Sequence, residues 1–96
     1  MIDRDGGTYR IGLPMLIANA RALLEAGRVL LRVEPEKEIL LDLASVQEVD
    51  SSALAVIFGL QRTAVTRGVS LRVANPPASL LSLAGLYGVD ESLPLA

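Results

Sequence analysis

The segment ILLDLASVQEVDSSALAVIFGLQRTAVTRGVSLRVANPP, residues 39–77, contains the pattern that says most about the fold. Its start belongs to a short apolar run, residues 38–43, which is typical of a strand buried on both faces. The polar group Val49-Asp50-Ser51-Ser52 then precedes a long, mostly apolar stretch that ends at Gly68. Residues 69–74 alternate between apolar and polar and predict the next strand. The segment therefore predicts a strand, a helix and a second strand, with a polar corner where the helix begins.

The predicted helix runs from Ser51 to about Arg67, and Asp50 is placed as its N-cap, accepting hydrogen bonds from backbone N–H groups two or three residues further on. At 100° per residue it has a wide apolar arc. This arc contains Ala53, Leu54, Val56, Ile57, Phe58, Leu60, Ala64 and Val65. The opposite side is small and polar, with Ser52, Ala55, Gly59, Arg62, Thr63 and Thr66. Gly59 costs about 1 kcal/mol relative to Ala in mid-helix, so we expect another backbone to approach there, either the first helix or a partner.

The flanking segments extend the same alternation of strands and helices. Residues 8–11 predict a strand after the Gly6-Gly7 turn, and residues 15–26 predict a helix with Gly27 as its C-cap. Residues 29–33 fit either a strand or the tail of that helix, and residues 78–87 predict a last helix. This order predicts one domain, residues 1–96, of the α/β class, in which helices cover a small, largely parallel sheet.

Composition excludes several classes of function. The chain has no Cys and no His, so common zinc sites and Ser-His or Cys-His nucleophile pairs are excluded. Its net charge is −2 and only 3% of its residues are aromatic, which argues against nucleic-acid binding. The N-terminus does not resemble a signal peptide, and no apolar run is long enough to span a membrane. We therefore expect a cytosolic protein.

The polar corner allows a binding role beside a purely structural one. Ser51 and Ser52 lie at the positive end of a helix dipole, where a phosphate group would be tolerated, although capping alone would also explain them. Asp42, Glu48 and Asp50 could hold Mg²⁺, but solvated loop carboxylates are commoner. No glycine-rich phosphate loop is present. Without a general base suited to neutral pH, a metal-dependent enzyme is the weakest hypothesis, and we expect neither a metal nor a cofactor.

The segment from residue 39 to Asn75 resembles the STAS domain family, named after sulphate transporters and anti-sigma factor antagonists. The ending LLSLAGLYGVDESLP, residues 80–94, is similar to the MlaB-like proteins, the small STAS subunits of Mla phospholipid-transport ABC systems. The resemblance implies a STAS-like fold, a mostly parallel mixed sheet of about four strands with flanking helices, and no catalytic activity. It implies a cytoplasmic protein, peripheral on an inner-membrane transporter and without direct membrane insertion.

The resemblance also implies a site. In antagonists the hydroxyl directly after the Asp is phosphorylated, and in MlaB-like proteins it lies at the interface with the transporter ATPase; both roles carry over to Ser51. The implied partner is an MlaF-like ATPase and, through it, the permease; the alternative is a serine kinase or anti-sigma factor. We expect the partner-binding residues to be Asp50, Ser51, Ser52, Ala55, Gly59 and Arg62. The turn Gly12-Leu13-Pro14 lacks the acidic residue usual in antagonists, and Ala53 replaces a common Gly. The missing acidic residue favours the transporter role.

Overall fold

Four strands form one mixed sheet in the computed structural model, which describes all residues, 1–96. The strands are β1 (Ile2–Asp5), β2 (Thr8–Ile11), β3 (Glu38–Asp42) and β4 (Ser70–Ala74), and they are neighbours in this order. β1 pairs antiparallel with β2, whereas the other pairs are parallel. The helices are α1 (Ile17–Arg32), α2 (Ser52–Thr66) and α3 (Ala78–Leu86), followed by the short 3-10 helix η1 (Asp90–Ser92). The predicted class, a mostly parallel sheet of four strands with flanking helices, is confirmed.

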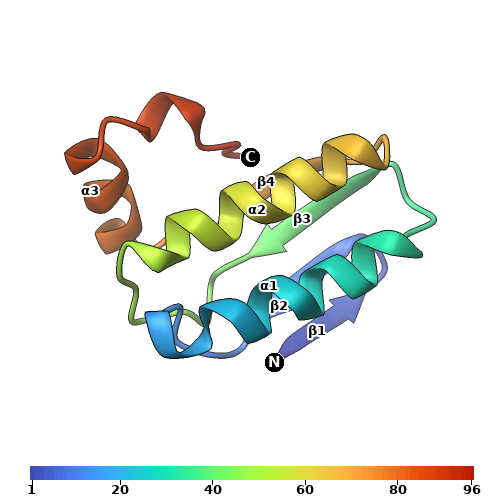
Figure 1. Cartoon of the computed structure of the whole chain (residues 1–96), viewed down its shortest axis with the longest axis horizontal. Coiled ribbons are helices and arrows are strands. Elements are labelled where there is room, and N and C mark those ends of the chain that lie inside the picture. The colour runs from blue at the N-terminus through green and yellow to red at the C-terminus, as the bar shows by residue number, and fades with distance from the viewer.

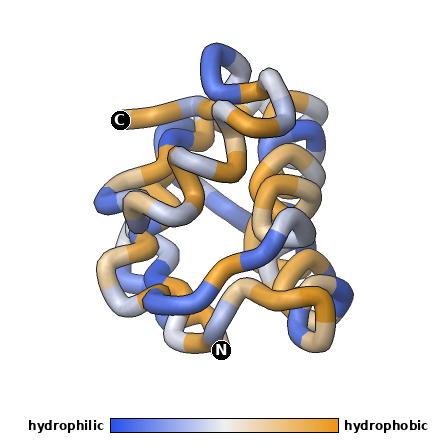
Figure 2. The backbone as a smooth tube through the Cα atoms, turned by 90° about the vertical axis from the view of Figure 1, so that its left-hand side faces the viewer, coloured by the Kyte–Doolittle hydropathy of each residue, from blue (hydrophilic) through white to orange (hydrophobic).

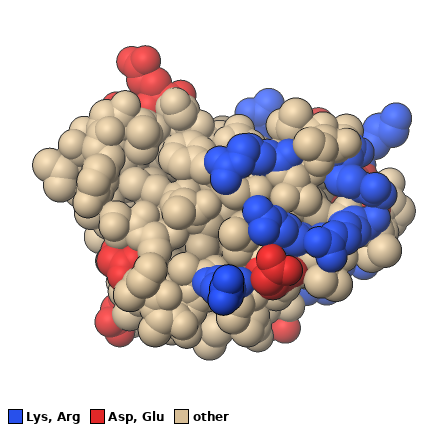
Figure 3. All heavy atoms as spheres, in the orientation of Figure 1, with Lys and Arg blue, Asp and Glu red and all other residues tan.

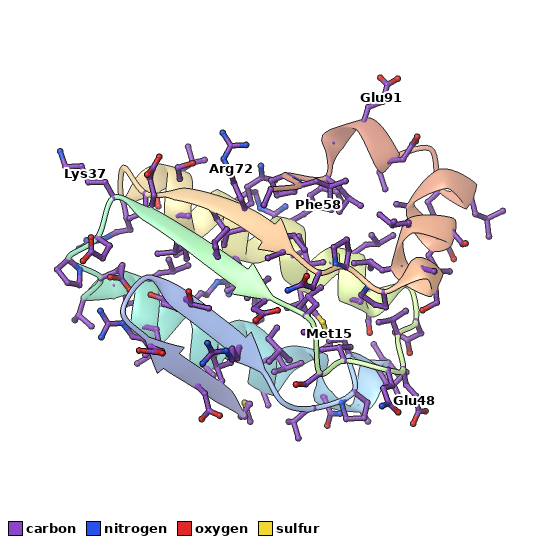
Figure 4. The ribbon with its side chains drawn as sticks, turned by 180° about the vertical axis from the view of Figure 1, so that it is seen from behind. Met15, Lys37, Glu48, Phe58, Arg72 and Glu91 are labelled. Atoms are coloured by element: carbon purple, nitrogen blue, oxygen red, sulfur yellow. The ribbon has the colours of Figure 1, made fainter.

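The two long helices lie side by side on one face of the sheet, and the other face is open (Figures 1 and 4). β3 and β4 therefore alternate between buried and exposed residues instead of being buried throughout. Leu40, in the middle of β3, is 39% exposed. The expectation that β3 is buried on both faces was wrong, because no helix crosses to the second face.

Two glycines let α1 and α2 pack closely. A Cβ atom on Gly27 would lie 2.4 Å from Cδ2 of Leu60 in α2, and one on Gly59 would lie 2.8 Å from Cδ1 of Leu24 in α1. Each helix thus places a leucine against the glycine of the other. Gly27 was expected to end the first helix, and this was wrong: α1 continues to Arg32, so residues 29–33 are its tail and not a strand.

A hairpin and a polar cluster attach the edge strand β1, which the sequence did not predict. Gly6 has φ 58°, a conformation that favours glycine, and it turns the chain from β1 into β2. The Arg4 guanidinium donates two hydrogen bonds of 3.1 Å to the Glu34 carboxylate. Tyr9, which is buried, donates its hydroxyl proton to the same carboxylate. Glu34 follows α1, so this cluster ties β1 and β2 to the end of that helix.

The C-terminal part of the chain covers the edge of β4. α3 ends close to the predicted boundary, and Gly88 with φ 69° follows it. The Val73 N–H donates to the carbonyl of Pro94 at 2.7 Å, and the Ala96 N–H donates to the carbonyl of Val73 at 2.9 Å. Figure 2 shows the apolar character of these last residues. None of the helices has the length and hydropathy that a membrane span requires.

Candidate partner-binding site at the start of α2

The loops that precede α1 and α2 are joined where both helices begin. The Met15 N–H donates to the Glu48 carbonyl at 2.9 Å, and the Asp50 N–H donates to the Met15 carbonyl at 3.2 Å. Met15 is buried, and Figure 4 shows Met15 and Glu48 at the same end of the sheet. These bonds form an isolated parallel bridge between Met15 and Val49. The corner before α2 is therefore held by backbone bonds and by a core side chain.

Asp50 connects the N-termini of the two helices through its side chain. One carboxylate oxygen, Oδ2, accepts a hydrogen bond of 2.9 Å from the Ile17 N–H, at the start of α1. The other, Oδ1, accepts a bond of 2.9 Å from the Ser52 N–H and another from the Ser52 hydroxyl. The predicted bond to the backbone two residues further on is thus present. The bond to α1 was not predicted, because nothing in the sequence places Ile17 beside Asp50.

These hydrogen bonds set the charge state of the corner. The Ser52 hydroxyl, followed by the Ile17 N–H, holds the pKa of Asp50 below its ordinary value, because both donors favour the ionised carboxylate. Asp50 is therefore a carboxylate at neutral pH, and both of its oxygens already have partners. Its place in the site is to fix the geometry of the corner.

The two adjacent serines have different environments. Ser52 is half-buried, and its hydroxyl donates to Asp50. Ser51 is exposed, and its hydroxyl takes part in none of the side-chain hydrogen bonds of the structure. Its backbone is already helical, with φ −61° and ψ −21°. The corner thus presents one free hydroxyl on a fixed backbone at the start of α2, and this hydroxyl belongs to Ser51.

The remaining predicted partner-binding residues divide into two groups. Ala55 and Arg62 are exposed, and at 100° per residue they lie within about 40° of Ser51 on the helix wheel. Gly59 is buried against Leu24, so the structure supports the alternative in which the first helix, and not a partner, approaches it. The expectation that Gly59 belongs to a partner surface is corrected accordingly. Of the predicted residues, Ser51, Ala55 and Arg62 therefore remain together on an exposed side of α2.

The acidic residues near the end of β3 do not form a metal site with this corner. Asp42 accepts hydrogen bonds of 3.0 Å from the Asn75 side chain and from the Ala44 N–H, and the Asn75 bond is the largest cause of its lowered pKa. Arg10 lies 3.6 Å from the same carboxylate. No three Asp, Glu, His or Cys side chains are close enough together to hold a metal ion. Asp42 instead joins the carboxyl ends of β2, β3 and β4.

One exposed feature was missed because α1 was expected to end too early. Arg21, Glu25, Arg28 and Arg32 recur at intervals of four, three and four residues, so they share one side of the longer helix. Their spacing is visible in the sequence. With the helix ended at residue 26, Arg28 and Arg32 could not be placed on that side.

The sequence from residue 12 to residue 95 matches the model of a protein family described as "Mlab, STAS domain". The chain belongs to this family. The match covers the site, from the loop before α1 to the C-terminal segment. No match was found among curated protein sequences.

Solved structures with the same fold support the STAS assignment. An anti-sigma factor antagonist from Thermotoga maritima, described as putative, matches with a TM-score of 0.77 and 16% identity over 99% of this chain and 83% of the other. The phosphorylated form of SpoIIAA, a Bacillus cell fate determinant, matches with a TM-score of 0.69 and 12% identity over 100% and 89%. A sulfate transporter family protein from Wolinella succinogenes matches with a TM-score of 0.68 and 23% identity over 90% and 69%. At these identities the likeness concerns the fold of this STAS domain.

Proposed function

We propose that this STAS domain is a non-catalytic subunit that binds the cytoplasmic ATPase of an Mla-type ABC transporter, which moves phospholipids between the inner and outer membranes. It would stabilise or regulate that complex from the cytoplasmic side. Membership of the Mlab family supports this function. The observation that carries the proposal is the free Ser51 hydroxyl on a rigid corner, continued by the exposed Ala55 and Arg62. Such a surface is preformed, so little conformational entropy is lost on docking.

Co-purification tests this function. The tagged chain is recovered from detergent-solubilised native membranes, and the ATPase that accompanies it is quantified by mass spectrometry. We expect Ser51→Glu, which adds charge and bulk at the docking surface, to reduce ATPase recovery severalfold. The matched control is Ser70→Glu, on the exposed face of β4, which should leave recovery unchanged. Unchanged recovery with Ser51→Glu, or no ATPase with the unmodified chain, would reject the proposal.

A second function is favoured by the same hydroxyl. In an anti-sigma factor antagonist controlled by a serine kinase, Ser51 would be the phosphoacceptor, and its exposure at the N-terminus of α2 suits an added phosphate. Intact mass spectrometry of the native protein would then show one phosphate that is lost in Ser51→Ala. A protein that remains unmodified in every growth condition would contradict this alternative.

A further inference from the structure

Arginines gather on the surface formed by α1 and α2, most of them towards the ends of the helices away from Ser51, and one, Arg21, about one turn from the start of α1. We define the arginine patch as Arg21, Arg28, Arg32, Arg62 and Arg67. Figure 3 shows basic side chains over the two helices, mostly over their C-terminal halves, with one acidic group among them. That group is Glu25, 3.3 Å from Arg28. The other four patch arginines form no ion pair.

Contacts between the helices hold the patch together. The Arg28 Nε–H group donates to the hydroxyl of Thr63, and the Arg67 guanidinium donates to the carbonyl of Arg32 at 2.7 Å. Both bonds cross from one helix to the other. Arg32 and Arg67 also lie at the C-terminal ends of α1 and α2, where a positive charge complements the helix dipole. The dipole would by itself explain arginines at these two positions. It does not explain Arg21 or Arg62, which lie outside the last turns of the two helices.

The patch reverses the charge of the chain locally. Its five arginines and Glu25 leave an excess of four positive charges, although the whole chain has a net charge of −2. Four basic and ten acidic residues remain for the rest of the molecule. Exposed aliphatic side chains lie on the same helical segments: Val29 is 55%, Val33 is 77% and Val65 is 69% exposed. The surface thus combines unpaired guanidinium groups with apolar contact area.

We propose that the arginine patch binds a carboxylate-rich, partly aliphatic surface of the transporter ATPase, as the second half of the interface that begins at Ser51. This inference rests on the proposed function. Arginine forks match carboxylates in bidentate geometry, and the one lysine of the chain, Lys37, lies outside both helices. The exposed apolar residues are valines, whereas binding in the plane of a membrane typically uses Trp, Phe or Leu. A protein surface is therefore favoured over lipid.

Isothermal titration calorimetry of the purified chain with the purified ATPase tests the inference. The unmodified chain should bind, and its Kd should rise by about tenfold between 50 and 300 mM NaCl, because salt screens exposed charges. The variant Arg32→Glu/Arg62→Glu should weaken binding at 50 mM by at least about thirtyfold and remove most of the salt dependence. The neutral pair Arg32→Gln/Arg62→Gln should fall between the two, and it replaces the reversal if that variant does not fold. The matched control is Arg72→Glu, on the open face of the sheet, which should change Kd by less than about twofold.

Each other outcome overturns the inference and can be recognised. Binding by the unmodified chain that neither patch variant changes rejects the patch and leaves the proposed function standing. No binding by the unmodified chain rejects the proposed function itself, before any variant is compared. Cosedimentation with phosphatidylcholine vesicles containing 30% phosphatidylglycerol, lost in the Arg32→Glu/Arg62→Glu variant, would assign the patch to a membrane. Salt-sensitive self-association in analytical ultracentrifugation, lost in the same variant, would assign it to a second copy of this chain.

Discussion

At their N-terminal ends α1 and α2 share one carboxylate, whereas at their C-terminal ends they share guanidinium groups. Asp50 gives both oxygens to the start of the helices, so its charge is satisfied inside the molecule. At the other end Arg67 donates to the carbonyl of Arg32, but most of the neighbouring arginines have no carboxylate partner. Both ends complement the helix dipole. The charge at the first end is thus used within the molecule, with Ser51 as the free group there, whereas the second end keeps guanidinium groups that no carboxylate of the chain neutralises.

The nearest carboxylate to the C-terminal end of α1 along the chain is used elsewhere. Glu34 follows α1 by two residues, yet its side chain is fully covered and accepts hydrogen bonds from Arg4, Tyr9 and the Glu36 N–H. The bond from Arg4 is the largest cause that lowers the pKa of Glu34 to about 2. In turn, burial first and this carboxylate second raise the pKa of Tyr9 above its ordinary value. Glu34 therefore cannot neutralise Arg32.

The largest effect should come from removing the Glu34 carboxylate, which holds the Arg4 and Tyr9 side chains at the end of α1. Glu34→Ala should lower Tm by roughly 15 °C, because it leaves the buried Tyr9 hydroxyl without its acceptor. Because the folded pKa of Glu34 is depressed, its contribution to stability is complete above about pH 4.5 and is lost as pH falls towards 2. Urea unfolding at pH 7 and pH 3 should therefore show a smaller acid loss in the variant. Glu36→Ala, at an exposed neighbour, serves as control; an equal loss in both variants would contradict the prediction.

The next effect concerns the glycine–leucine packing between α1 and α2, which holds the two helices together along their length. Gly27→Ala places a methyl group 2.4 Å from Cδ2 of the buried Leu60, and it should lower Tm by roughly 10 °C, because overpacking outweighs the gain in helix propensity. Gly85→Ala is the matched control, since a Cβ there meets nothing within 4 Å in α3. It should leave Tm unchanged or raise it slightly. Thermal unfolding followed by circular dichroism compares the two variants. Equal Tm values would show that the packing of Gly27 against Leu60 has room for a methyl group and would contradict the prediction.

A smaller effect should follow from removing the shared carboxylate. Asp50→Ala deletes the acceptor for the Ile17 and Ser52 N–H groups and should lower Tm by roughly 6 °C, as loss of a helix cap does. Hydrogen exchange should increase at the starts of both helices, not of α2 alone. If exchange changed only at α2, Asp50 would not couple the two helices.

The smallest effects should separate the two serines. Ser52→Ala removes the hydroxyl bond to Asp50 and should lower Tm by about 4 °C. Ser51→Ala removes a hydroxyl without a partner and should shift Tm by less than about 2 °C. Differential scanning calorimetry of the two variants measures both values. A larger loss for Ser51→Ala than for Ser52→Ala would reverse the roles assigned to these residues.

Local patterns predicted most of the fold, and distant contacts account for what they missed. The strands at residues 8–11, 38–43 and 69–74 and the helices at 51–67 and 78–87 follow from periodicity and end close to their observed bounds. β1 could not be predicted because charged residues fill most of it, and it is held by pairing with β2 and by Glu34.

The errors within the helices have the same origin. A glycine at a helix end and a glycine at a helix crossing look alike in sequence, since both positions require the absence of a Cβ atom. What distinguishes Gly27 is Leu60, which lies 33 residues away. At the corner, the capping role of Asp50 was predictable from its neighbours. That only Ser51 remains free depends on the hydrogen bond from the Ser52 hydroxyl to Asp50, which the sequence does not reveal.

The close packing at Gly27 and Gly59 fixes α1 and α2 relative to each other, so the distance between the two ends of the helix pair is also fixed. The axis from Ser51 to Arg67 measures about 24 Å at about 1.5 Å per residue, and neither helix can slide without moving the leucine that fills its partner's glycine. A protein that touches both ends must therefore hold its own contact points at that spacing. If the two contact points of an ATPase moved apart during its cycle, this chain could not lengthen to follow them. It would keep one contact and lose the other, and its affinity would change with that motion.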